Sequence, residues 1–198
     1  AGNDTLKLLK NGQKLVANQG YAFIDFGTTT NKVLVKVSLS SANCEGAAAN
    51  LDKELSHWSF DKVKREAKQQ WKRILSRIKA EGANKEEMRV FYTALYHAYL
   101  APYLFSDAHG NYKGPDGEIH SVGKANQYTV FSLWDTFRAA HPLFTITQKT
   151  RVNDMIKSFI RHYEAHDLLP NWELMGNESH CMIGNHAIPI ITEAYLKG

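Results

Sequence analysis

Residues 84–100 read NKEEMRVFYTALYHAYL and carry the clearest helix pattern in the chain. Asn84 is followed three residues later by Glu87, the spacing of a capping box at a helix start. Apolar side chains then recur along one helical face, at Met88, Phe91, Leu95, Ala98 and Tyr99. Pro102 comes soon after and marks the end of the segment. This pattern predicts an amphipathic helix, and its recurrence elsewhere predicts a mainly helical protein.

Four further segments show the same periodicity. A helix over residues 61–80 ends at Gly82, a third covers Ser132–His141, a fourth follows Thr147, and a fifth begins near Ser179 and contains Pro189. The face of the first predicted to lie inward comprises Val63, Ala67, Trp71, Ile74, Leu75 and Ile78. The corresponding face of the fourth comprises Val152, Met155, Ile156, Phe159, Ile160 and Tyr163.

The first 43 residues have a different pattern. Residues 20–26 and 32–39 alternate between apolar and polar side chains, and a Gly-Thr-rich turn separates them, which predicts a hairpin or part of a larger antiparallel sheet. Residues 107–127 are rich in turn formers and predict a long loop with a small hairpin. The chain starts in a strand-like segment and stops in a helix, so it is expected to be a piece of a longer protein.

Bulk composition is that of an ordinary globular protein. Of 198 residues, 43% are hydrophobic and 22% are charged, and no apolar run is long enough to predict a membrane span. Two cysteines, Cys44 and Cys181, do not make a disulfide framework or a zinc site. The net charge of +4 is concentrated in residues 61–79, which hold eight basic and two acidic side chains. A solvated helix face is favoured over nucleic-acid binding, because no stacking platform accompanies the charge.

The segment 169–180 (LPNWELMGNESH) places two carboxylates, Glu173 and Glu178, beside Trp172. A carboxyl group against an aromatic wall loses solvation of its charged form, as a general acid requires. Spacing alone also allows a structural interpretation, in which Asn177 or Ser179 caps a helix and a glutamate satisfies backbone donors. The two interpretations stay open at this point.

The segment 132–141 (SLWDTFRAAH) contains a second polar and aromatic cluster. Asp135 and Arg138 are three residues apart, so on a helix they can pair, either to hold sugar hydroxyls over Trp134 or to fix helix packing. His162 and His166 are four apart and could share a metal, but no zinc-protease pattern accompanies them and solvated histidines are favoured.

Taken together, these segments resemble glycoside hydrolase family 92, the exo-acting bacterial α-mannosidases. The resemblance covers most of residues 45–198 and is carried by residues 91–107, 112–120, 131–144 and 169–191. It implies a fold that is mainly α with an N-terminal β segment, namely a partial (α/α)6 toroid preceded by the last strands of a β-sandwich. Residues 1–43 would then be terminal sandwich strands, 44–83 linker helices, and 84–198 the first part of the catalytic domain.

The resemblance also implies a calcium-dependent, inverting hydrolysis of terminal α-mannosides from glycans by a protein that is periplasmic, on the cell surface or extracellular. It assigns Glu178 as general acid, with Glu173 as second choice, and assigns mannose binding to Trp134 and Asp135. Arg138, Trp172 and Asn177 are further candidate substrate-binding residues. The base and most calcium ligands are expected beyond residue 198, in the rest of the catalytic domain or in a separate chain, so no metal ligand is expected here and the chain alone is expected to be inactive. A non-catalytic carbohydrate-binding or assembly module is the alternative.

Two positions depart from the resemblance. Asn185 stands where an aromatic residue is common, and Glu193 stands where aspartate is common. Both departures bear on which mannose linkage is preferred.

Overall fold

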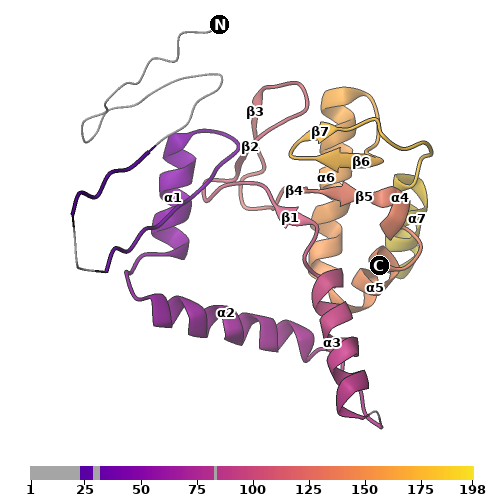
Figure 1. Ribbon diagram of the computed structural model, residues 1–198. Coiled ribbons are helices and arrows are strands. Elements are labelled where there is room, and N and C mark those ends of the chain that lie inside the picture. Colours follow the sequence, from indigo (N-terminus) through magenta and orange to yellow (C-terminus); the bar gives the residue numbers. More distant parts are fainter. Residues whose placement is uncertain (1–22, 29–31, 83) are drawn as a thin grey trace, which may run out of the picture. The chain divides into compact units, whose positions relative to one another are not determined.

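The computed structural model describes residues 23–28, 32–82 and 84–198, and divides the chain into two units, Ala1–Leu34 and Val35–Gly198. All helices and strands of the described residues lie in the second unit (Figure 1). The described residues form seven helices: α1 Cys44–Glu54, α2 Phe60–Leu75, α3 Lys85–Ala98, α4 Leu133–Thr136, α5 Ala140–Thr147, α6 Lys149–His166 and α7 Ala187–Lys197. The strands are β1 Tyr103–Leu104, β2 Asn111–Lys113, β3 Ile119–Ser121, β4 Tyr128–Thr129, β5 Phe131–Ser132, β6 Trp172–Leu174 and β7 Asn177–Glu178. The predicted mainly helical class is confirmed.

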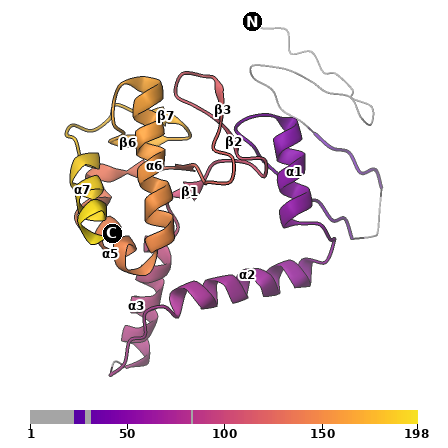
Figure 2. The same ribbon diagram turned by 180° about the vertical axis from the view of Figure 1, so that it is seen from behind.

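The hydrophobic core lies where α5, α6 and α7 pack together, as Figure 2 shows from behind. Phe159 on α6 is fully buried, and its ring meets that of Phe131 on β5 edge-on, with ring centroids 4.8 Å apart. The buried apolar members of this cluster are Tyr128, Phe131, Leu133, Phe144, Val152, Met155, Phe159, Ala187 and Ile190. On α6, Val152, Met155 and Phe159 are buried as predicted, whereas Ile160 and Tyr163 are 43% and 50% exposed.

Three small antiparallel sheets connect the helices. β1 pairs with β4, β2 pairs with β3, and β6 lies between β5 and β7. The β2–β3 hairpin confirms the hairpin predicted within residues 107–127. In the third sheet Ser132 stands opposite Trp172, and Glu173 stands opposite Glu178, so this sheet brings the two polar clusters of the sequence together.

Two predicted helix boundaries are wrong. Ser132 lies in β5, and the expected helix 132–141 is divided into the short α4 and a separate α5 that starts at Ala140. The fifth helix starts at Ala187 instead of near Ser179. Pro142 and Pro189 therefore lie in the first turns of α5 and α7, where the missing N–H group has no helical acceptor to lose.

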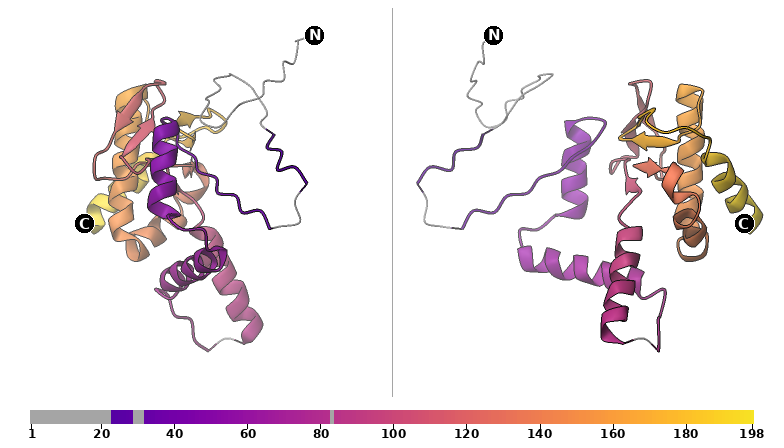
Figure 3. Two further views of the ribbon diagram at one scale, coloured as in Figure 1. Left: turned by 90° about the vertical axis from the view of Figure 1, so that its left-hand side faces the viewer. Right: turned by 45° about the vertical axis from the view of Figure 1, so that its right-hand side comes forward.

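The helices before residue 100 bury little surface. The capping box predicted for α3 is present, with the Asn84 side chain accepting from the Glu87 backbone and the Glu87 side chain accepting from Asn84. Of α3 only Leu95 is buried, and Phe91, predicted to lie inward, is 37% exposed. α2 meets α3 (Figure 3), has no buried residue and ends at Leu75, earlier than predicted.

The predicted hairpin in the first 43 residues is not seen in the described part of that segment. Residues 23–28 and 32–40 have no strand partner there, and Val35, Val37 and Leu39 are 59%, 75% and 83% exposed. A strand is stabilised by its neighbour, so alternation alone does not produce one. Residues 20–22 lie outside the described residues. Among the helices that the structure describes, none combines the length and apolar character needed to cross a membrane.

Candidate active site

The β6–β7 turn places two glutamates opposite each other. Glu173 on β6 and Glu178 on β7 are register partners, separated by the turn residues Met175 and Gly176, both at positive φ (52° and 91°). A Cβ on Gly176 would lie 2.8 Å from the Lys113 carbonyl oxygen, so the hairpin β2–β3 approaches this turn too closely for any other residue. Facing residues on paired strands project from the same side, which makes the carboxyls neighbours.

Glu173 is buried, with 4% of its surface exposed. Its Oε1 accepts hydrogen bonds from the Thr129 hydroxyl (2.7 Å) and the Gly176 amide (2.5 Å), and its Oε2 accepts one from the Val130 amide (3.1 Å). Burial raises the pKa of this carboxyl to about 7; the three donors oppose the rise, and the nearby Glu178 adds to it. The group is therefore protonated over much of the acid range.

Glu178 is partly exposed and bound by backbone amides. Its Oε2 accepts from Asn171 (2.7 Å) and Trp172 (3.1 Å), and its Oε1 accepts from Trp172 (3.0 Å) and His180 (3.3 Å). His180 has a φ of 54°, a left-handed conformation that is uncommon for a non-glycine residue. The longest of these bonds thus comes from a strained residue in the segment after β7.

The α4 segment, which carries Trp134, is connected to this carboxylate through the backbone of Asn171. The Leu133 amide, at the start of α4, donates to the Asn171 carbonyl oxygen (2.9 Å). Trp134 follows on α4 and is half-buried, while Asp135 is exposed. Of the other predicted binding residues, Trp172 is half-buried on β6, and Asn177 is exposed on β7.

The Asp135–Arg138 ion pair that the spacing allows is not among the ion pairs that the described residues form. Arg138 instead lies over aromatic rings, with its guanidinium carbon 5.8 Å from the Trp134 centroid and 5.5 Å from the Phe137 centroid. The reason is that α4 ends at Thr136, so Asp135 and Arg138 do not share a continuous helical face.

Asn171 and His186 are functional candidates that the sequence reasoning missed. Asn171 is 8% exposed, and its side chain bonds two carbonyl groups of the 179–186 segment as well as the His186 ring. The sequence contained one signal for Asn171: it directly precedes the Trp172–Glu173 pair and has no helix of its own to cap.

Three histidines lie in a row beside the carboxylates. The ring of His166 is 5.5 Å from that of His162 and 6.0 Å from that of His180, between centroids. Burial lowers the pKa of His162 to about 4, with His166 adding to the shift, and its Nε2 is buried without a partner. No group of three or more metal-binding side chains suited to a metal ion occurs among the described residues.

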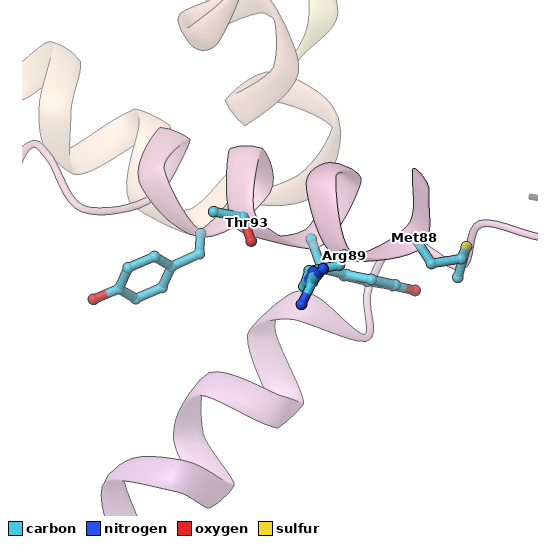
Figure 4. Close-up of a pocket in the computed structure, with 5 residues that line it drawn as sticks. Met88, Arg89 and Thr93 are labelled. Atoms are coloured by element: carbon cyan, nitrogen blue, oxygen red, sulfur yellow. The ribbon is translucent and has the colours of Figure 1, made fainter. Parts of the chain in front are cut away.

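The hollows of the second unit differ in size and lining. A cavity of about 10 Å³, which is water-sized, borders Glu173 and His162. An open hollow of about 380 Å³ on α3 is lined by Met88, Arg89, Tyr92, Thr93 and Tyr96 and contains no carboxylate (Figure 4). A third hollow, about 880 Å³, is bordered by residues 37–41, α1 and the region of Met175.

Comparison with known proteins identifies the class to which this arrangement belongs. Residues 46–198 match the description "Glycosyl hydrolase family 92 catalytic domain". The matched segment contains both glutamates, the α4 tryptophan and the 179–186 segment. The chain belongs to glycosyl hydrolase family 92.

Solved structures and a curated relative agree with this assignment. A family 92 α-mannosidase of Bacteroides thetaiotaomicron is 34% identical, with a TM-score of 0.72 over 80% of this chain and 23% of its own. A family 92 inverting mannosidase of the same organism is 32% identical, with a TM-score of 0.72 over 80% of this chain and 22% of its own. An uncharacterized secreted glycosidase of Arthroderma benhamiae is 32% identical over 40% of this chain and 11% of its own length. The chain thus spans less than a quarter of each.

Proposed function

We propose that the chain is part of the catalytic domain of an exo-acting α-mannosidase, which removes terminal α-linked mannose from glycans with inversion. Three observations support this proposal: the family match, the α-mannosidase and inverting mannosidase among the similar structures, and the solved complex of one of these relatives with mannoimidazole. The glycan linkage is a matter for experiment.

The observation that carries the proposal is the position of Glu178. Its carboxyl is partly exposed, fixed by three backbone amides, and separated by one peptide from the α4 segment that holds Trp134. In the proposed mechanism Glu178 donates a proton to the departing glycosidic oxygen. The His180 amide, at 3.3 Å, makes the longest of its bonds, so Oε1 is the oxygen more easily freed to carry the proton that passes to the leaving oxygen.

The remaining predicted residues fit supporting roles. We assign the half-buried Trp134 as an apolar floor for the mannose ring and the exposed Asp135 as an acceptor for its hydroxyls. Trp172 and Asn177 lie on the strands that carry the glutamates, and Arg138 covers the Trp134 ring. These roles remain proposals.

Glu173 is the second candidate for the acid because its pKa is raised to about 7, which suits proton donation near neutral pH. Its geometry opposes the role. Both oxygens are bound by Thr129, Val130 and Gly176, and the cavity next to it, about 10 Å³, is too small for a sugar. We therefore assign Glu173 to holding the β6–β7 turn in place.

Inversion also requires a base that activates water, with the two carboxyl groups roughly 6.5–9.5 Å apart. Glu173 does not meet this need, since it is enclosed, so we expect the base beyond residue 198, in the rest of the catalytic domain or in a separate chain. By itself the chain is then expected to be inactive.

Calcium dependence is likewise proposed from the family resemblance. Among the described residues, no cluster of three or more His, Cys, Asp or Glu side chains that could hold a metal ion occurs. We expect the ligands in the remainder of the domain and assign no step on this chain to the ion.

The proposed organisation places residues 1–43 in a β-sandwich, 44–83 in linker helices and 84–198 in an (α/α)6 barrel. We also propose a periplasmic, cell-surface or extracellular location, which the word "secreted" in the name of the Arthroderma relative supports.

The proposal is tested on the complete catalytic domain with α-linked mannobiose and methyl α-mannoside. Proton NMR during early turnover is expected to show β-mannose appearing first, and chelation of calcium is expected to abolish turnover. Binding of mannosides by calorimetry without any hydrolysis, with calcium present, would instead indicate a carbohydrate-binding module and overturn the proposal.

A further inference from the structure

The side-chain amide of Asn171 has only one orientation that satisfies its neighbours. Its Nδ2 lies 2.9 Å from the Met182 carbonyl oxygen and 3.2 Å from the Ile183 carbonyl oxygen. Carbonyl oxygens only accept hydrogen bonds, so the nitrogen must face them and Oδ1 must face the other way. That oxygen lies 2.7 Å from Nδ1 of His186.

This orientation fixes the tautomer of His186. An amide oxygen only accepts, so the proton of the imidazole must be on Nδ1, and in the neutral ring Nε2 carries a lone pair. Within the part of the chain that the structure describes, Nε2 has no hydrogen-bond partner. It is also absent from the buried, unpartnered polar atoms, which are Tyr99 Oη, Gln148 Nε2 and His162 Nε2. The acceptor lone pair of His186 therefore reaches solvent.

The ring is also held from its faces and edge. The Phe137 ring lies 4.7 Å from it, between centroids. Gly184 has a φ of 108°, and a Cβ there would lie 2.4 Å from Cε1 of His186, so only glycine allows this approach. A hydrogen bond and two close neighbours thus fix the direction in which Nε2 points.

The same asparagine connects this imidazole to the two clusters already described. Its backbone amide donates to Glu178 (2.7 Å), and its carbonyl oxygen accepts from Leu133, one residue before Trp134. His186 and Glu178 are therefore bonded to one buried residue. A buried polar residue with all its groups satisfied holds such neighbours in a single arrangement.

We propose that His186 is a substrate-binding residue whose Nε2 accepts a hydrogen bond from a sugar hydroxyl next to Glu178, and that Asn171 is the positioning residue that fixes its tautomer. The ligand class is a polyol ring, since an acceptor nitrogen beside the aromatic ring of Phe137 takes hydrogen bonds from hydroxyl groups. This inference rests on the proposed function and adds a residue to it.

The competing role for His186 is structural, in which its bond to Asn171 merely holds the 179–186 segment. Two amide substitutions separate the roles, because the asparagine amide reaches the position of Nδ1 and the glutamine amide, one methylene longer, reaches that of Nε2. His186→Asn keeps the contact with Asn171 and loses the one with substrate. His186→Gln does the reverse.

The experiment measures KM and kcat of the complete catalytic domain on methyl α-mannoside, together with the melting temperature of each variant. We expect His186→Asn to raise KM about tenfold, as the loss of one neutral hydrogen bond does, with kcat nearly unchanged. His186→Gln is expected to retain most of the wild-type KM and to melt at a lower temperature. The reverse order, with Asn as the rescuing residue, would overturn the inference in favour of the structural role.

A double-mutant cycle tests the part assigned to Asn171. Asn171→Ala is expected to raise KM about tenfold in the wild-type background and to have almost no further effect on KM in His186→Ala, because it acts through the same ring. Equal effects in both backgrounds would overturn the positioning role. A wild-type domain without mannosidase activity would overturn the proposed function itself. If the domain is active but its KM is unchanged in both His186 variants, only this inference is overturned.

Discussion

Two regions on either side of the β6–β7 turn contain the same residue type in opposite settings. The enclosed region consists of Glu173, Thr129, Val130 and Gly176, and all of these residues are buried except the half-buried Val130. The open rim consists of Asn171, Glu178, Trp134 and residues 179–186, and apart from the buried Asn171 it is half-buried to exposed. Register alone makes the two glutamates equivalent. The comparison shows that burial and donor geometry, rather than sequence position, separate a structural carboxyl from an available one.

The largest expected difference between the regions is in stability. Phe159→Ala removes a fully buried ring that packs on Phe131, so we expect a loss of about 3–5 kcal/mol in the free energy of unfolding. Met182→Ala, at a 40% exposed rim position, should cost less than about 1 kcal/mol. Urea unfolding of both variants measures the contrast. Similar losses would mean that the rim is packed as tightly as the core.

The next effect concerns pH and Glu173. Its folded pKa of about 7 lies above the ordinary value of 4.5, so the native state binds more protons than the unfolded state between these values. The protonated carboxyl therefore makes its full contribution to the free energy of unfolding below about pH 4.5. As the pH rises to about 7, this contribution falls by about 3 kcal/mol in total.

The matched control is Glu173→Gln, which carries no titrating proton. Subtracting its unfolding free energy from that of the wild type, at each pH from 4.5 to 7.5, isolates the glutamate. A difference that stays flat across this window would show that Glu173 is charged throughout, and the enclosed region would then be wetter than its 4% exposure indicates.

A smaller effect is expected at Thr129, whose hydroxyl donates to Glu173 and lies 3.3 Å from the Gly176 amide. Thr129→Val keeps the shape and removes the hydroxyl, which should destabilise the fold by about 1–2 kcal/mol. Thr129→Ser retains the donor and serves as the control. If the valine variant is as stable as wild type, the hydroxyl does not hold the carboxyl.

The smallest effect is expected on the rim, at Arg138. The guanidinium lies over the Trp134 and Phe137 rings and is exposed, so Arg138→Gln should lower the free energy of unfolding by only about 0.5 kcal/mol. Thermal unfolding at low and high salt measures it. A loss above 2 kcal/mol would show that Arg138 has a buried partner and that the rim is not open.

Sequence reasoning predicted the features that depend on local pattern. The capping box of Asn84 and Glu87 and the helix after Thr147 follow from residues within a few positions of each other, and both are present. The start of α7 was predicted too early because Pro189 was treated as an interior helix residue, although it lies in the first turn.

The parts that could not be predicted depend on contacts distant in sequence. Ser132 lies in a strand because it pairs with Trp172, which is 40 residues away in the sequence, and a local pattern cannot predict that pairing. Asn171 was overlooked because its importance comes from five hydrogen-bond partners: Leu133, Glu178, Met182, Ile183 and His186. The resemblance supplied the segments that matter, but not which of two adjacent carboxyls is enclosed.

The most direct test of the account is the dependence of Glu178→Gln on the leaving group, measured as kcat/KM of the complete catalytic domain. A general acid matters most for a poor leaving group, so methyl α-mannoside should lose about 10²–10⁴-fold, while dinitrophenyl α-mannoside should react nearly as in the wild type. Glu173→Gln is expected to change kcat/KM by the same factor for both substrates. An equal loss on both substrates for Glu178→Gln, with the selective loss appearing in Glu173→Gln instead, would contradict the account.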